Sequence, residues 1–225
     1  MVIYLLFTGT SRAEPSGNGT KSNLTTQLLE ARQGNPVAMV EVAGTLLEIS
    51  RVNNDEGLRA HAFGWMLAAA RQGHAEAAEL TGRYYRNGTG VEQNFAKSEK
   101  WLMRAKQRKS GGADFELALY YRDERNPSRD QHIAARYLNA ALKRKDPRAC
   151  ILAAFQKIQR QTPLRAALKE LICAAEGGVI PAMLVLADYY EKRSSPNAAY
   201  KSRTWLKKAA AAGSPVALER LFPLP

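Results

Sequence analysis

The sequence of 225 residues predicts an all-α protein, a right-handed superhelical solenoid of about five helix–turn–helix repeats with a C-terminal capping helix. Three observations predict this fold. An alanine recurs at a nearly constant spacing, the residues after it share one helix face, and an aromatic residue followed by alanines recurs in the second half of most units. Self-similarity at a period of about 20 to 50 residues is typical of stacked repeats that share a continuous core.

The recurrent alanine marks the first helix of each repeat. Its six positions are spaced by 39, 36, 36, 33 and 35 residues: Ala38, Ala77, Ala113, Ala149, Ala182 and Ala217. At about 100° per residue, the positions four, five and eight residues further on lie on the same helix face. The residue five positions on is small in every full repeat: Ala43, Gly82, Ala118, Ala154 and Ala187. We therefore expect this face to pack closely against a second helix.

A second helix follows in each repeat. An aromatic residue and then alanines mark it in segments 65–70, 101–105, 137–141 and 205–210. Repeat four departs from the pattern twice: Lys157 stands where three other repeats have a tyrosine, and Glu170 stands where the aromatic residue is expected. Glycines at 73, 177–178 and 213 are expected to end these helices, because glycine tolerates positive φ.

At these residues the chain resembles the Sel1-like repeat family, relatives of the tetratricopeptide repeats. The family pattern is Ala-x-x-x-Leu-Gly-x-x-Tyr, then a Gly-x-Gly-Val loop, a Lys-Ala-x-x-Trp stretch and Lys-Ala-Ala-x-x-Gly. Repeat two matches best, with Ala77, Gly82, Tyr85, Gly88-Thr89-Gly90-Val91, Trp101 and Ala105. The resemblance covers residues 35–222, interpreted as one repeat domain with a capping helix over 214–222. Residues 14–34 are interpreted as a polar segment and N-terminal capping helix, and segments 50–57 and 122–128 as irregular linkers.

The first thirteen residues have two interpretations. Residues 2–7 form a short apolar run, and Ala13 offers a small residue at a cleavage position, which is typical of the end of a secretory signal. The basic segment that normally precedes the apolar run is missing. The segment is therefore either a truncated signal peptide, which favours a periplasmic or secreted protein in a bacterium, or an ordinary N-terminal tail, which leaves a cytoplasmic location open.

The two cysteines both lie in repeat four. Cys150 stands near the start of the first helix and Cys173 near the end of the second, and these ends are adjacent in an antiparallel helix pair. The two sulfur atoms could therefore meet and form a disulfide. The resemblance to the Sel1-like family favours this bond, because members of the family have disulfides between paired helices. The alternative is two buried free thiols, which are common in helical cores.

Charge and polar residues argue against catalysis. The formal net charge is +12, from 33 basic and 21 acidic residues, and the excess lies mostly on second helices and linkers. The three histidines, His61, His74 and His132, form no cluster with metal-ligand spacing. The Gly88–Val91 segment follows a helix rather than a strand and is interpreted as a turn rather than a phosphate loop. We expect a protein that is not an enzyme and has no metal and no cofactor.

The far side of the first helices supplies candidate partner-binding residues. In tetratricopeptide-like solenoids the first helices line a concave groove, and in repeats three to five the positions expected to face it are apolar. The candidates are Phe115, Leu119, Ile151, Leu152, Phe155, Ile158, Leu184 and Val185, with Arg83 and Arg86 from repeat two. Apolar patches rimmed by charge often mark partner sites. The alternative is a narrow groove, or one occupied by the N-terminal segment.

The resemblance implies a protein-binding module. Secreted bacterial members of the Sel1-like family serve as adaptors in envelope assemblies, or as immunity proteins that occupy secreted effectors such as phospholipases. We expect a protein partner, and an acidic one makes the most economical use of the excess positive charge. The alternative is a basic envelope protein that binds a polyanion, either an anionic lipid or a polysaccharide; no nucleic-acid motif accompanies the basic charge.

Overall fold

The computed structural model describes residues 19–222, and these divide into two compact units. The N-terminal unit extends to Arg144 and the C-terminal unit begins at Lys145. Each unit is described by itself. The segment interpreted as a signal peptide, residues 1–13, lies outside the described residues, and the interpretation of residues 35–222 as one domain concerns both units and stays a prediction.

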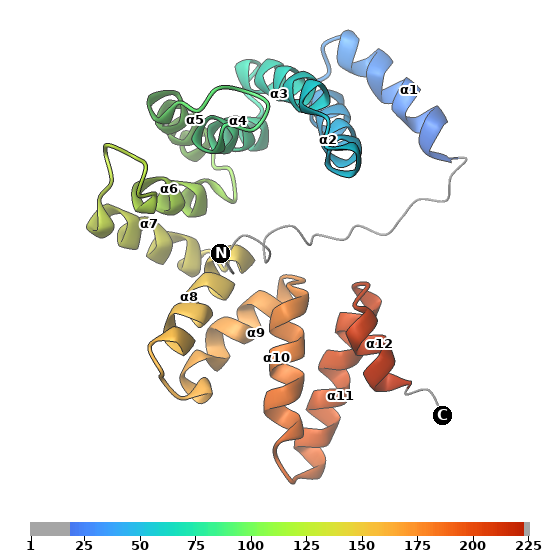
Figure 1. The fold of residues 1–225 in the computed structure, drawn as a ribbon, viewed down its shortest axis with the longest axis vertical. Helices are drawn as coiled ribbons and strands as arrows, with labels where there is room; N and C mark the ends of the chain where they lie inside the picture. Colours follow the sequence, from blue (N-terminus) through green and yellow to red (C-terminus); the bar gives the residue numbers. More distant parts are fainter. Residues whose placement is uncertain (1–18, 223–225) are drawn as a thin grey trace. The chain divides into compact units, whose positions relative to one another are not determined.

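Both units are built from α-helices that pair in chain order (Figure 1), and residues 19–222 contain no β-strand. The helices of the N-terminal unit are α1 (Gly19–Arg32), α2 (Pro36–Asn53), α3 (Glu56–Arg71), α4 (Ala75–Asn87), α5 (Phe95–Gln107), α6 (Ala113–Arg122) and α7 (Gln131–Lys143). Those of the C-terminal unit are α8 (Pro147–Gln159), the 3₁₀ helix η2 (Leu164–Ala167), α9 (Leu168–Glu176), α10 (Ile180–Glu191), α11 (Pro196–Ala211) and α12 (Pro215–Leu221). The predicted all-α class is confirmed.

The predicted core face is confirmed. All six repeat alanines are at most 1% exposed, and so are the residues four positions later in four repeats, Val42, Thr81, Leu117 and Leu186. The position directly after the alanine is also buried in five repeats, at Met39, Ala78, Asp114, Cys150 and Met183, which the sequence pattern did not single out. The first helices are therefore buried over a wider arc than predicted.

The helix ends follow from local sequence. Four helices have a proline in their first turn, where the backbone N–H has no partner within the helix and its absence costs nothing. These prolines are Pro36, Pro147, Pro181 and Pro215. Gly73, Gly178 and Gly213 have φ values of 96°, 88° and 90°, so the chain turns at these glycines after α3, α9 and α11.

One expected linker is almost entirely helical. Segment 50–57 was expected to be irregular, but α2 continues to Asn53 and α3 begins at Glu56. Asn54 adopts the left-handed conformation at φ 51°, and the Asp55 side chain accepts a hydrogen bond from the Leu58 N–H. The polar residues here are thus the two caps of adjacent helices. The segment at 122–128 does lie between α6 and α7.

Candidate functional site

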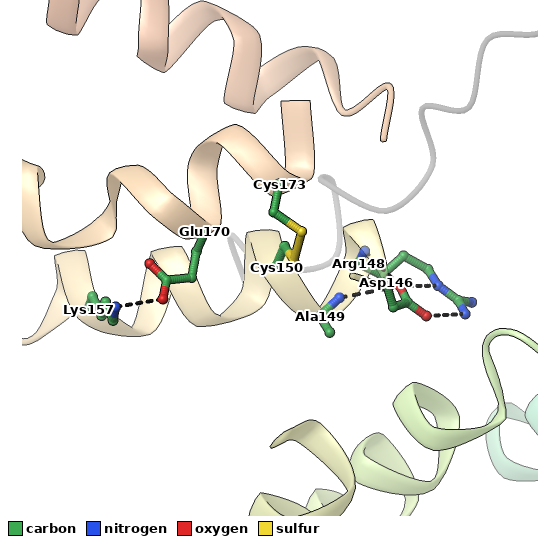
Figure 2. Close-up of a disulfide and its surroundings, with 7 residues drawn as sticks. All are labelled: Asp146, Arg148, Ala149, Cys150, Lys157, Glu170 and Cys173. Atoms are coloured by element: carbon green, nitrogen blue, oxygen red, sulfur yellow. Dashed lines mark hydrogen bonds and ion pairs between the residues drawn. A yellow bond between two sulfur atoms is a disulfide. The ribbon is translucent and has the colours of Figure 1, made fainter. Parts of the chain in front are cut away.

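Repeat four is joined covalently. Cys150 of α8 and Cys173 of α9 form a disulfide with their Cα atoms 6.0 Å apart, as Figure 2 shows. The bond links the start of one helix to the end of its antiparallel partner. The sequence left open a disulfide or two free thiols, and the structure has the disulfide. This bond joins the two helices of repeat four, the first of which carries four of the candidate partner-binding residues.

The two residues of repeat four that differ from the repeat pattern, Lys157 and Glu170, form an ion pair. Lys157 Nζ of α8 lies 2.7 Å from Glu170 Oε1 of α9, as Figure 2 shows. The same Nζ also donates to the carbonyl oxygen of Ala166 at 3.0 Å. An ion pair therefore stands where other repeats have aromatic residues. Sequence reasoning noted each departure alone and missed their pairing, although the opposite charges were a readable signal.

The apolar candidates of the C-terminal unit are only partly covered. Leu152, Phe155 and Ile158 of α8 are half-buried, as are Leu184 and Val185 of α10. Ile151 is 7% exposed and belongs to the interior. The structure thus leaves five of the six apolar candidates of this unit partly accessible, while the alanines of the same helices are buried.

A pocket of about 460 Å³ adjoins Val185 in the C-terminal unit. Residues of η2 and its flank line one side and residues of α10 and its end line the other: Pro163, Leu164, Arg165, Val185, Asp188, Tyr189, Lys192 and Arg193. The Arg193 guanidinium lies 3.4 Å from the centroid of the Tyr189 ring, a cation–π contact that holds this side chain at the rim. Asp188 is paired with Arg220 of α12 at 2.7 Å. The pocket therefore has an apolar lining and a mainly basic rim.

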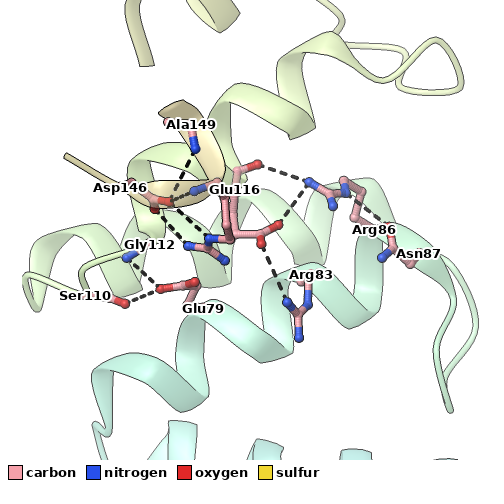
Figure 3. A network of polar contacts seen from close by, with 10 residues as sticks. Glu79, Arg83, Arg86, Asn87, Ser110, Gly112, Glu116, Asp146 and Ala149 are labelled. Atoms are coloured by element: carbon pink, nitrogen blue, oxygen red, sulfur yellow. Dashed lines mark hydrogen bonds and ion pairs between the residues drawn. The ribbon is translucent and has the colours of Figure 1, made fainter. Parts of the chain in front are cut away.

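The candidates of the N-terminal unit are less accessible. Phe115 is 1% exposed and Arg86 is 6% exposed, so both belong to the interior, whereas Leu119 and Arg83 are half-buried. Arg86 Nη1 lies 3.2 Å from a carboxylate oxygen of the buried Glu116, and Arg83 Nη1 lies 3.9 Å from the other (Figure 3). A continuous apolar strip from repeat three to repeat five involves both units and stays a prediction.

A second buried carboxylate, Glu79 of α4, holds the start of α6. Its Oε2 accepts hydrogen bonds from the Ser110 hydroxyl and, at 3.0 Å, from the Gly112 N–H (Figure 3). Gly112 is the N-cap residue of α6 and has no side chain with which to cap that helix. Glu79 therefore accepts the N–H of the N-cap residue of the next repeat's first helix, as the glutamate of a capping box does within its own helix. Glu79 lies two positions after the repeat alanine Ala77, outside the face that the sequence pattern predicts to be buried.

An aromatic cluster in repeat three surrounds a third carboxylate. The Tyr121 hydroxyl donates to Glu99, the Tyr120 hydroxyl lies 3.3 Å from the same carboxylate, and the Tyr121 and Tyr137 rings stack with centroids 5.8 Å apart. Burial and the hydrogen bond to Glu99 raise the pKa of the Tyr121 phenol above its ordinary value. This cluster packs α5, α6 and α7 together.

Searches of the described residues reveal neither a metal site nor a membrane span. In residues 19–222, His, Cys, Asp and Glu side chains form no group of three or more that could hold a metal ion. Over the same range, no helix combines the length and the apolar character that crossing a membrane requires.

Known structures share this fold. A Sel1 repeat protein from Oxalobacter formigenes superposes with a TM-score of 0.63 and 24% identity, over 88% of this chain and 57% of that one. A protective antigen with an SLR fold from uropathogenic Escherichia coli superposes with a TM-score of 0.52 and 19% identity, over 88% of this chain and 50% of that one. A Sel1 repeat protein from Klebsiella pneumoniae superposes with a TM-score of 0.55 and 17% identity, over 88% of this chain and 96% of that one. The predicted likeness to Sel1 repeats is confirmed at the level of the fold.

Likeness in sequence is more limited. No family model matches this chain. A curated relative, the ERAD-associated E3 ubiquitin-protein ligase component HRD3B of Arabidopsis thaliana, is 34% identical over 84 residues, which are 37% of this chain and 14% of that protein. This chain thus spans a small part of that relative and about half the length of two of the similar structures.

Proposed function

We propose that this chain is a protein-binding module without catalytic activity, and that it binds its partner through the apolar side chains of α8 and α10. Leu152, Phe155, Ile158, Leu184 and Val185 are named here the apolar strip. The observation that carries the proposal is the partial exposure of all five side chains on helices whose opposite face is fully buried. Apolar side chains at the centre of an interface lose their contact with water on binding, which favours association.

The surroundings of the strip favour an acidic partner with an apolar anchor. Val185 also lines the 460 Å³ pocket, so the strip leads into a hollow large enough for a side chain. Arg165, Lys192 and Arg193 stand at the rim of that pocket, and the whole chain has a net charge of +12. Opposite charge on the partner would steer its approach, and an aromatic or aliphatic side chain would fill the pocket.

An extracytoplasmic adaptor or immunity protein is the finer form of the proposal. Disulfides persist in oxidising compartments and are rare in the cytosol, so the Cys150–Cys173 bond supports a periplasmic or secreted location in a bacterium. An immunity protein would occupy a secreted effector such as a phospholipase, and an adaptor would join components of an envelope assembly. Both roles use the same surface and need no chemistry.

The variant Phe155→Asp tests the apolar strip. We expect it to weaken binding of a partner captured from an envelope extract by about 2 kcal/mol, a typical loss at the centre of an interface, with little change in melting temperature. A marked fall in melting temperature instead would mean that Phe155 is packed inside the protein, because the substitution then buries an unpaired carboxylate. That result would contradict the proposed surface.

The double variant Lys207→Glu/Lys208→Glu is the control for charge. Both lysines are exposed on α11, away from the residues of the strip. We expect it to leave partner binding nearly unchanged. If it abolishes binding, and if the affinity falls steeply with salt, the polyanion alternative would replace the apolar strip.

A further inference from the structure

A second pocket lies in the N-terminal unit, and its polar lining is basic. It has a volume of about 340 Å³ and is formed by the C-terminal ends of α3 and α5 and the first turns of α4: Ala70, Arg71, Ala78, Arg104, Gln107 and Arg108. Ala70 and Ala78 are 4% and 1% exposed, so two small side chains form its floor. Three arginines and one glutamine line the hollow, and none of the lining residues is acidic.

Arg108 is held in place by the turn between α3 and α4. Its Nη1 donates to the carbonyl oxygen of Gly73 at 3.0 Å. A β-carbon at residue 73 would lie 2.2 Å from that same nitrogen, so the guanidinium packs against the glycine and occupies space that any other residue would need. The bond uses one of the five N–H groups of the guanidinium, which leaves Nε and Nη2 with donors to offer.

Arg104 is also oriented by a neighbour. Its Cζ lies 4.8 Å from the centre of the Trp101 ring, a cation–π contact with a side chain that is itself 9% exposed. The arginine is one turn before Arg108 on α5, so both project from the same helix face. Two of the three guanidinium groups are thus positioned before any ligand arrives, which lowers the entropic cost of binding.

We infer that this pocket binds a phosphate group. Planar guanidinium groups bind phosphate through pairs of parallel N–H···O bonds, and converging arginines without a nearby carboxylate leave their charge to be balanced by a ligand. The volume admits a phosphate together with a small group attached to it. The phosphate comes either from a soluble molecule or from a phospholipid headgroup, and both present the same chemistry to the arginines.

Calorimetric titration of the full chain with inorganic phosphate at low ionic strength tests the soluble source. We expect saturable binding at one site. The double variant Arg71→Gln/Arg104→Gln should weaken it by about tenfold or more, because a hydrogen bond to a charged group contributes at least about that factor. Both arginines are exposed, so the variant should fold, with a melting temperature lowered only slightly by loss of the Arg104–Trp101 contact. The matched control is Arg203→Gln/Lys207→Gln, which removes the same charge from exposed positions of α11 and should bind as wild type does.

Sedimentation with phosphatidylcholine vesicles, with and without phosphatidic acid, tests the lipid source. Binding to phosphatidic acid vesicles alone, lost in Arg71→Gln/Arg104→Gln and kept in the control, would support a lipid headgroup. If neither inorganic phosphate nor phosphatidic acid binds, the inference is overturned. Equal losses of binding in the variant and the control would also overturn it, since the effect would then reflect net charge alone. The inference does not rest on the apolar strip: Phe155→Asp should leave phosphate binding unchanged whatever it does to a protein partner.

Discussion

Replacement of Gly82 tests a close contact between α4 and α5. A β-carbon at residue 82 would lie 2.6 and 2.7 Å from Cγ and Cδ2 of Leu102, and 3.1 Å from its backbone nitrogen. Leu102 is 0% exposed and has no room to move away. The Ser98 hydroxyl donates to the Gly82 carbonyl at 2.7 Å and ties α5 to α4 at the same level. An added methyl group must therefore displace either the leucine or the whole helix.

The magnitude follows from two opposing effects. Overpacking of a tight core costs about 1–3 kcal/mol, while replacing a glycine in a helix interior by alanine stabilises by about 0.5–1 kcal/mol. Gly82→Ala should therefore range from nearly neutral to about 2 kcal/mol less stable, and Gly82→Leu should lose about 1–3 kcal/mol in net terms. Urea unfolding followed by circular dichroism measures the change in the free energy of unfolding.

Gly64 of α3 provides the matched control. It is exposed, and a β-carbon there would meet no atom within 4 Å. Gly64→Ala should therefore stabilise the protein by about 0.5–1 kcal/mol. In a double-mutant cycle, Leu102→Ala should relieve the clash and make Gly82→Ala less harmful than it is in the wild type. If Gly82→Ala stabilises as much as Gly64→Ala does, the close approach of α4 and α5 is refuted.

Three further predictions concern bonds described above. The protein purified without reductant should show no free thiol in denaturant, and replacing Cys150 and Cys173 by alanine should cost about 3 kcal/mol, because the bond closes a loop with a sequence separation of 23; two titratable thiols would contradict the bond. Glu79→Ala should destabilise by about 1–3 kcal/mol by leaving buried donors unpaired, and Glu79→Gln, which keeps an acceptor, should lose less in the same unfolding assay. The pKa of Tyr121 is raised on folding, so this group's stabilisation is complete below the unfolded pKa of about 10 and is lost as the pH rises toward the folded value. Ultraviolet titration should detect the ionisation of Tyr121 at a higher pH than that of a free tyrosine, and Glu99→Gln should lower the pKa of Tyr121. A tyrosine titration that is identical in native and unfolded protein would contradict the raised pKa.

The helix pairs could be predicted from sequence because their cause is local and periodic. An alanine such as Ala77, followed by Thr81 and Gly82 on the same face, permits one close approach, and the structure places all three against α5 and the core. Proline and glycine set most of the helix ends by the same local logic. The expected linker at 50–57 was wrong because its polar residues, Asn54 and Asp55, cap two helices that almost touch end to end.

The polar interior could not be predicted in the same way. Glu79, Arg86 and Glu116 look like solvent-facing residues in a single-helix projection, yet all three are at most 6% exposed. They are buried by the neighbouring repeat, and the helix period contains no information about that neighbour. The same reasoning explains why Phe115 was expected in a groove and is found inside. The Lys157–Glu170 pair, by contrast, could have been found by asking whether two departures in one repeat compensate each other.

The bond from Glu79 to the start of α6 has a consequence for how the N-terminal unit unfolds. In a linear repeat protein, stability is approximately a sum of the terms of single repeats and of the interfaces between nearest neighbours. Glu79 adds to such an interface two hydrogen bonds that hold the backbone directly before α6, because its carboxylate accepts from the Ser110 hydroxyl and from the N–H of the N-cap residue Gly112. Repeats two and three should accordingly melt as one cooperative block. A chain shortened to begin after Gln107 should lose the first turn of α6, even though every residue of that helix is still present.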